Sequence, residues 1–188
     1  MNGPSTAATW ARGCALLIGG ARSGKSRLAV ELAAASGRPV VFVATAEPGD
    51  ADMADRIDRH RAERPPAWTT VEEPIDLAGV LERVATDAFV VVDCLTLWVA
   101  NLVFADRSDD EILAAAGTLA SALAARHAPS VVVTNEVGLG IHPDTDLGRR
   151  YRDLLGGVNR AVATGAWRSL LVVAGRAIRL DHPHELLQ

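Results

Sequence analysis

The chain has 188 residues, which fits one globular domain. Hydrophobic residues make up 49% of it and charged residues 22%, a balance that excludes a disordered chain. The net charge of −4 excludes a general nucleic-acid binder, because such a protein needs a basic surface to displace counterions from phosphates. A site for a phosphate group must therefore be built locally.

Two further features bear on the cellular compartment. No apolar run reaches the ~18–20 residues needed to span a bilayer, and the first thirteen residues lack the apolar centre of a signal peptide. Cys14 and Cys94 lie in separate apolar runs, which predicts two buried core residues rather than a disulfide or a metal site. We therefore expect a cytoplasmic protein in which residues 1–12 form a flexible tail and residues 13–188 form a single domain.

Short apolar runs rich in β-branched residues predict buried strands at 15–18, 40–43, 89–92, 131–133 and 170–173. Helical patterns lie between them, at 26–35, 52–62, 109–126 and 144–163. This alternation predicts a doubly wound α/β domain, a mostly parallel sheet between layers of helices, with ligands at the carboxyl ends of the strands. The order of the strands does not follow from the sequence.

Two segments are harder to assign. Pro65 and Pro66 end the second helical pattern, and a short strand over 68–71 follows them. The segment 95–104 is apolar almost throughout, which fits either a buried helix or part of a subunit contact.

The residues from Gly19 to Ser26, GGARSGKS, fit the phosphate-loop pattern G-x-x-x-x-G-K-[ST] at every fixed position. An apolar strand precedes them and a helix follows. Glycines let successive backbone N–H groups turn toward phosphate oxygens, and the helix adds the positive end of its dipole. Lys25 would reach the β- and γ-phosphates, and the Ser26 hydroxyl would bind Mg²⁺. The loop therefore predicts that this single domain binds a nucleoside triphosphate.

The composition supports this interpretation of Lys25. Of the 19 basic residues, eighteen are arginines and Lys25 is the one lysine. Arginine presents a planar fork and lysine a compact point charge on a thin stem. A chain that otherwise uses arginine throughout keeps lysine where a phosphate loop needs the point charge.

Two other strand ends carry polar residues. Asp93 ends the third predicted strand, where a carboxylate could hold Mg²⁺ or orient a substrate hydroxyl, or could simply cap the next helix. The sequence Thr-Asn-Glu-Val-Gly at 134–138 ends the fourth strand and fits either a loop over the same edge or an ordinary turn. It is not the Asn-Lys-x-Asp loop with which GTP-switch proteins bind guanine.

On the second predicted helix, His60 shares a face with Met53 and Ile57 and is set apart from the charged residues. It is either a structural histidine or a nucleophile. A neutral imidazole could attack an α-phosphate and form a phosphoramidate, and this form is populated near neutral pH.

Several segments together resemble one family, the bifunctional adenosylcobinamide kinase / adenosylcobinamide-phosphate guanylyltransferases of cobalamin biosynthesis. They are the phosphate loop, Val-Ala-Thr-Ala at 43–46, Met-x-x-Arg-Ile-x-x-His-x-x-x-Arg-Pro at 53–65, Asp-Cys-Leu-Thr-Leu-Trp at 93–98 and the segment 134–138. The resemblance runs from about Cys14 to about Gly175. It implies a RecA-like P-loop fold, Mg²⁺ as cofactor and a homotrimer.

The resemblance also implies two reactions. ATP or GTP phosphorylates adenosylcobinamide, and GMP then passes from GTP through a histidine to adenosylcobinamide phosphate, which yields adenosylcobinamide-GDP and pyrophosphate. By position, His60 would carry the GMP and Lys25 would be the second catalytic residue. Mg²⁺ would be bound by Ser26 and Asp93. The implied nucleotide contacts are Gly19, Gly20, Ala21, Arg22, Ser23, Gly24, Lys25, Ser26, Ala44, Thr45, Arg61, Ala62, Glu63, Arg64, Glu72 and Asp93.

Three other functions fit the residues. The chain could be a P-loop kinase of another small metabolite with no histidine intermediate, or a relative that retains only the kinase step. It could also be a non-enzymatic module whose affinity for a partner is controlled by GTP. The lack of an Asn-Lys-x-Asp loop counts against the last of these.

Overall fold

The computed structural model describes residues 11–47, 49, 61–62 and 64–187. Its elements, in chain order, are β1 (Gly13–Gly19), α1 (Lys25–Ala35), β2 (Val40–Ala44), β3 (Thr69–Glu72), α3 (Leu77–Arg83), β4 (Phe89–Asp93), α4 (Leu95–Phe104), α5 (Asp109–Ala125), β5 (Pro129–Asn135), α6 (Asp146–Gly165), β6 (Arg168–Val173), β7 (Arg176–Leu180) and α7 (Pro183–Leu186). The tail expected at 1–12 lies outside the described residues up to residue 10. Of the helix expected at 52–62, only Arg61 and Ala62 are described, and both are helical.

Within the described part of the chain, the strands form one seven-stranded sheet in the order β3-β2-β4-β5-β1-β6-β7. Every neighbouring pair is parallel except β6 and β7, which are antiparallel. The five strands expected from the sequence are confirmed within a few residues at their ends, and the short strand expected at 68–71 is confirmed as β3. The sequence patterns predict neither α3 nor β7.

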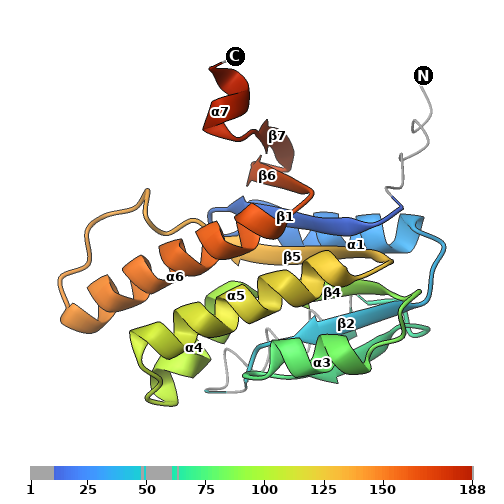
Figure 1. The fold of residues 1–188 in the computed structure, drawn as a ribbon, viewed down its shortest axis with the longest axis horizontal. Coiled ribbons are helices and arrows are strands. Elements are labelled where there is room, and N and C mark those ends of the chain that lie inside the picture. Colours follow the sequence, from blue (N-terminus) through green and yellow to red (C-terminus); the bar gives the residue numbers. More distant parts are fainter. Residues whose placement is uncertain (1–10, 48, 50–60, 63, 188) are drawn as a thin grey trace.

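Helices cover both faces of the sheet, so the expected three-layer α/β architecture is confirmed (Figure 1). On one face, Val90 and Val92 of β4 pack in a core with α3, α4, α5 and α6. On the other face, Phe89 and Val91 pack in a second core with α1. Successive side chains of a strand point to opposite faces, so a strand buried on both sides is a continuous apolar run.

The apolar segment 95–104 forms the buried helix α4. Trp98, Val99 and Leu102 are buried, and the Trp98 indole N–H donates to the Ile75 carbonyl at 2.7 Å. The buried-helix alternative is therefore confirmed for this segment, although Phe104 at its end is exposed. Among the described residues, no helix is long and apolar enough to cross a membrane.

Neither cysteine forms a disulfide. Cys14 in β1 is buried, as expected, and burial raises the pKa of its thiol to about 12. Cys94 follows β4 and is only partly exposed; burial and the neighbouring Asp93 raise its pKa to about 11. Both thiols are therefore protonated at neutral pH, which fits packing residues rather than nucleophiles.

Candidate functional site

The phosphate loop lies where the sequence predicts it, between the end of β1 and the start of α1. At two positions of the loop, the structure requires glycine. Gly24, at the N-cap of α1, has a φ of 101°, in the left-handed region that L side chains rarely adopt. At Gly19, a Cβ atom would lie 2.2 Å from the carbonyl oxygen of Val172, so no larger residue fits there.

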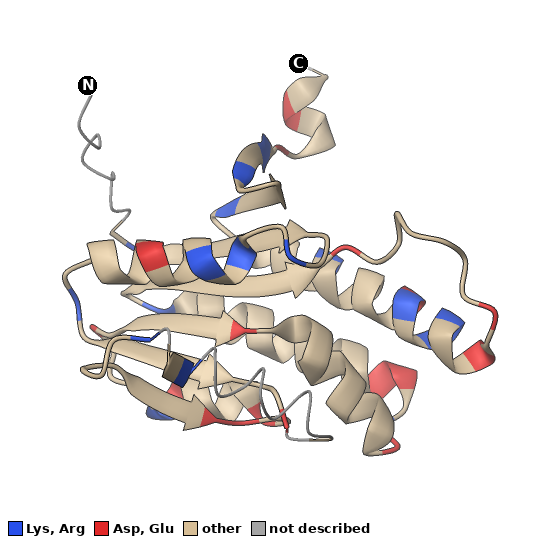
Figure 2. Cartoon of the chain, turned by 180° about the vertical axis from the view of Figure 1, so that it is seen from behind, with Lys and Arg blue, Asp and Glu red and all other residues tan. Residues whose placement is uncertain are grey.

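Lys25 is the first residue of α1, and its side chain turns back into the loop. Its ammonium donates to the carbonyls of Gly19 at 3.0 Å and Gly20 at 2.7 Å, and to the Ser23 hydroxyl at 3.3 Å. Lys25 is buried, and this burial lowers its pKa, while Cys94 and Asp93 act in the opposite direction. The loop thus concentrates positive charge at one point. Over the rest of the ribbon, basic and acidic segments are interleaved (Figure 2).

Asp93 ends β4 and lies within electrostatic reach of Lys25. Strand β5 separates β4 from β1, so Asp93 is one strand away from the loop. The helix that follows has Cys94 at its N-cap, and no side chain caps it. The alternative in which Asp93 caps this helix is therefore wrong, because Asp93 is still the last residue of the strand. Asp93 therefore lies at the carboxyl edge of the sheet, where its charge acts on Lys25.

Two arginines and a glutamate extend the site over β2 and β3. Arg61 forms an ion pair with Glu72 at the end of β3. The guanidinium of Arg64 lies 3.8 Å from the centre of the Phe42 ring, and burial lowers its pKa, while Asp93 acts against that shift. Residues that are far apart in the sequence therefore meet as one charged cluster at the carboxyl ends of β2, β3 and β4.

Thr45 follows β2 and is completely buried. Its hydroxyl donates to the Cys94 carbonyl at 2.7 Å and accepts from the Cys94 N–H at 2.8 Å, and its own N–H donates to the Asp93 carbonyl at 3.1 Å. Ala44 is paired with Asp93 and Glu72 in the sheet. The structure therefore gives the Thr45 side chain a positioning role: it holds the segment that carries Asp93.

The segment 134–138 combines both of the alternatives that the sequence left open. Residues 137–140 form an ordinary turn, in which the Gly140 N–H donates to the Val137 carbonyl at 3.2 Å. The residues before the turn are tied to the phosphate loop, because the Glu136 N–H donates to the Gly19 carbonyl at 3.2 Å. The end of β5 thus contacts the loop directly.

Behind this strand end lies a buried polar network that the sequence motifs did not predict. The Thr134 hydroxyl donates to Asn159 Oδ1 at 2.7 Å, and Asn159 Nδ2 donates to the Asn135 carbonyl at 3.0 Å. Asn159 lies on α6 among the buried residues Leu155, Val158 and Val162. An asparagine on an otherwise apolar helix face was the available signal.

The residues His60 and Glu63 lie outside the described residues, so both stay predictions. Arg61 and Ala62, directly after His60 in the chain, are described and exposed. Among the described residues, no group of three or more His, Cys, Asp or Glu side chains could hold a metal ion by itself.

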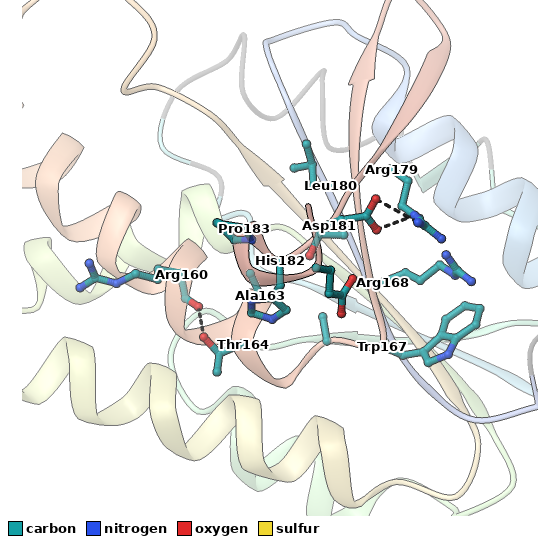
Figure 3. Close-up of a pocket in the computed structure, with 13 residues that line it drawn as sticks. Arg160, Ala163, Thr164, Trp167, Arg168, Arg179, Leu180, Asp181, His182 and Pro183 are labelled. Atoms are coloured by element: carbon teal, nitrogen blue, oxygen red, sulfur yellow. Dashed lines mark hydrogen bonds and ion pairs between the residues drawn. The ribbon is translucent and has the colours of Figure 1, made fainter. Parts of the chain in front are cut away.

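A cavity of about 410 Å³ lies beside β6 and β7, at the end of the strand order away from β3. It is formed by the end of α6, the start of β6 and the segment leading into α7 (Figure 3). Its lining includes Arg168, Arg179 and His182. Arg179 is paired with Asp181, and the guanidinium of Arg168 lies over the Trp167 ring. None of the predicted site residues that the structure describes lines this cavity, so the candidate site remains at the carboxyl ends of the strands.

The fold and the loop together define a P-loop nucleotide-binding protein with a RecA-like sheet. The flagellar accessory protein FlaH from Methanocaldococcus jannaschii has a similar fold, with a TM-score of 0.51 and 16% identity, over 90% of this chain and 78% of that chain. The chain belongs to the cobinamide kinase / cobinamide phosphate guanyltransferase family, which matches residues 15–180.

Curated relatives agree with this assignment. The bifunctional adenosylcobalamin biosynthesis protein CobP of Pseudomonas aeruginosa is 45% identical over 167 residues, which cover 85% of this chain and 92% of that protein. The corresponding protein CobU of Escherichia coli is 38% identical over 178 residues, which cover 88% of this chain and 98% of that protein. The family expected from the sequence motifs is confirmed.

Proposed function

We propose that this chain is a bifunctional enzyme of cobalamin biosynthesis. It phosphorylates adenosylcobinamide with ATP or GTP, and it then transfers GMP from GTP to adenosylcobinamide phosphate. The observation that carries this function is the family match over residues 15–180, which includes the phosphate loop and the charged cluster beside it. The products of the second reaction are adenosylcobinamide-GDP and pyrophosphate.

In the kinase step, the oxygen of the substrate hydroxyl attacks the γ-phosphorus, the bond from the γ-phosphorus to the β-phosphate oxygen breaks, and the hydroxyl proton is released to solvent. Negative charge builds on oxygens during this transfer, and groups that are already aimed at those oxygens stabilise it. Lys25 is such a group, because its ammonium is held inside the loop. The loop amides and the start of α1 bind the remaining phosphate charge.

In the guanylyl transfer, a nitrogen of the His60 imidazole attacks the α-phosphorus of GTP. The α–β bond breaks, pyrophosphate leaves, and a phosphoramidate links His60 to GMP. A phosphate oxygen of adenosylcobinamide phosphate then attacks the same phosphorus and displaces the imidazole. Arg61 and Arg64 follow His60 closely in the chain, and both lie at the charged edge where triphosphate charge needs compensation.

The residues at this edge also fit Mg²⁺, which prefers oxygen ligands and keeps several waters or phosphate oxygens in its shell. The Ser26 hydroxyl follows Lys25 in the loop, and the Asp93 carboxylate lies at the adjoining strand end within reach of the Lys25 charge. These two residues would hold the ion. When bound, Mg²⁺ neutralises charge on the transferring phosphates.

The histidine step is tested by incubating the protein with GTP labelled at the α-phosphate. The wild type should retain label that is stable to base and labile to acid, as a phosphoramidate is. His60→Ala should retain none and still fold, whereas His127→Ala, at an exposed position after α5, should label like the wild type. Equal labelling of His60→Ala and wild type would remove His60 from the mechanism.

The acceptor is tested by adding adenosylcobinamide phosphate to the labelled protein. Label should leave the protein and appear on the corrinoid. Phosphorylation of adenosylcobinamide with no protein label at any stage would instead favour a kinase without a histidine intermediate.

A homotrimer is the assembly that the family resemblance implies, and we include it in this proposal. Light scattering coupled to size-exclusion chromatography measures the mass in solution directly. A mass of three chains supports the trimer, and a mass of one chain excludes it.

A further inference from the structure

The turn between β6 and β7 lies against the phosphate loop, on the opposite side from the charged cluster over β2 to β4. We infer that the backbone N–H of Gly175 in this turn is a positioning group for the phosphate loop, which sets the direction of a loop amide that binds phosphate. The Gly175 N–H donates to the Ser23 carbonyl at 2.8 Å. This inference rests on the proposed binding of a triphosphate by the loop.

The effect passes through a single peptide group. The Ser23 carbonyl and the Gly24 N–H belong to the same planar trans peptide, so they point in opposite directions. A hydrogen bond that holds the Ser23 carbonyl toward the β6–β7 turn therefore aims the Gly24 N–H away from the turn. In a phosphate loop, the amides bind the ligand and the carbonyls must find donors elsewhere. Gly175 supplies the donor for Ser23.

The β6–β7 hairpin has a tight two-residue turn, which fixes the position of the Gly175 N–H. Val173 pairs with Arg176, so Ala174 and Gly175 alone form the turn. Their φ angles are 50° and 71°, and a type I′ hairpin turn requires such a left-handed pair. A left-handed alanine costs about 1 kcal/mol or more, so the surroundings determine this conformation.

Packing places the hairpin against the loop at two further points. A Cβ atom at Gly19 would meet the Val172 carbonyl at 2.2 Å, and one at Gly24 would lie 3.4 Å from the Gly175 Cα atom. Strand β6 is also paired directly with β1, which leads into the loop. The two ends of the loop therefore each rest against the same hairpin.

The test replaces the peptide N–H of Gly175 by an ester oxygen in a chain whose C-terminal segment is synthetic. The ester deletes the donor and keeps the glycine. An ester at Ala174, one residue earlier in the same segment, controls for the chemistry of ligation. The affinities for GTP and for guanosine are measured on both chains and on the wild type.

The Gly175 ester should weaken GTP binding about tenfold relative to the Ala174 ester, the size expected for one hydrogen bond to a charged group. Guanosine affinity should not change, because guanosine has no phosphate. In the Gly175 ester, the KM for GTP should rise as the affinity for GTP falls, and the KM for the corrinoid should stay the same. Equal GTP affinities for the two esters, or equal losses for GTP and guanosine, would overturn the inference.

A second variant keeps the donor. Gly175→Asn retains the N–H and tolerates a left-handed φ, and a Cβ at this position meets nothing within 4 Å. Its GTP affinity should stay within about twofold of the wild type, and a tenfold loss would contradict the inference. A wild type that fails to bind GTP would refute the proposed function itself, so the two failures are distinguishable.

Discussion

Lys25 places a buried ammonium among three oxygen acceptors, at 2.7 to 3.3 Å. A guanidinium is larger and planar, so it cannot occupy the same point. We expect Lys25→Arg to lower both transfer activities about a hundredfold or more, the loss typical of removing one charge-stabilising donor. Steady-state rates for each half-reaction measure this.

The thermal unfolding midpoint of Lys25→Arg, recorded beside these rates, separates lost chemistry from lost folding. Arg27→Lys, at an exposed position of α1 that pairs with Glu31, is the matched control and should retain most activity. Wild-type rates for Lys25→Arg in both reactions would show that position 25 needs only a positive charge.

The buried thiol of Cys14 makes the free energy of unfolding depend on pH in the alkaline range. Its thiol pKa is about 12 in the folded chain, against an ordinary value of 9.0. Above pH 9 the unfolded chain loses a proton that the folded chain keeps, so stability falls as pH rises from about 9 toward 12 and is unaffected below that range. The contribution reaches about 1.4 kcal/mol per pH unit.

Urea unfolding at pH 8, 9 and 10 tests this. Cys14→Ala should be less stable than the wild type at pH 8, because it leaves a cavity in the core, but its stability should fall less steeply above pH 9. Cys94 also has a raised pKa and contributes to both chains equally, so the difference in slope isolates Cys14. Parallel slopes would contradict the assignment.

At the scale of elements, Asn159 joins α6 to the end of β5. Removing either partner leaves a buried polar group without its hydrogen bond, which costs about 1–3 kcal/mol. We expect Asn159→Leu and Thr134→Val each to destabilise the fold, and the double variant to be more stable than the sum of the two losses by about 1 kcal/mol. A double-mutant cycle from urea unfolding measures this coupling.

Thr118→Val is the control for that cycle, because the exposed Thr118 hydroxyl donates to the Ala114 carbonyl of its own helix and so links no two elements. Its effect should stay within about 0.5 kcal/mol. Strict additivity of the Asn159 and Thr134 variants would show that their hydrogen bond does not link the two elements.

Strand β4 and strand β7 show what sequence patterns can predict. Phe89 to Val92 is buried on both faces, so its apolar run is unbroken and the strand is evident. Every residue of β7 is exposed, and arginines interrupt its apolar residues, so its strand character depends on pairing with β6. Propensity says little about a strand that is held by backbone pairing to one neighbour.

The candidate site likewise has one part that the sequence predicts and another part that it does not. The phosphate loop is a contiguous motif between a strand and a helix, so its place and the role of Lys25 follow from the sequence. The contacts of Thr45 with Cys94, and of Gly175 with Ser23, join positions that only the strand order brings together. Local patterns contain no information on that order, and these positioning contacts could not be predicted.

For the whole molecule, the proposed function assigns two transfers to a chain of 188 residues that carries one phosphate-loop motif. Both transfers need a triphosphate held by its non-reacting phosphates, and Lys25 of this loop and Arg64 both interact electrostatically with Asp93, which lies at the strand end between them. We therefore expect both reactions to use the same nucleotide site. Equilibrium dialysis should find one nucleotide bound per chain.

Inhibition by a GTP analogue with a methylene group between the α- and β-phosphates examines the same point kinetically. The analogue cannot donate GMP, and it should compete with the nucleotide in the kinase reaction and in protein labelling with one inhibition constant. Lys25→Ala should weaken its binding in both assays by the same factor, because one ammonium serves both. Two different inhibition constants, or two nucleotides per chain, would require a second site that forms without the loop.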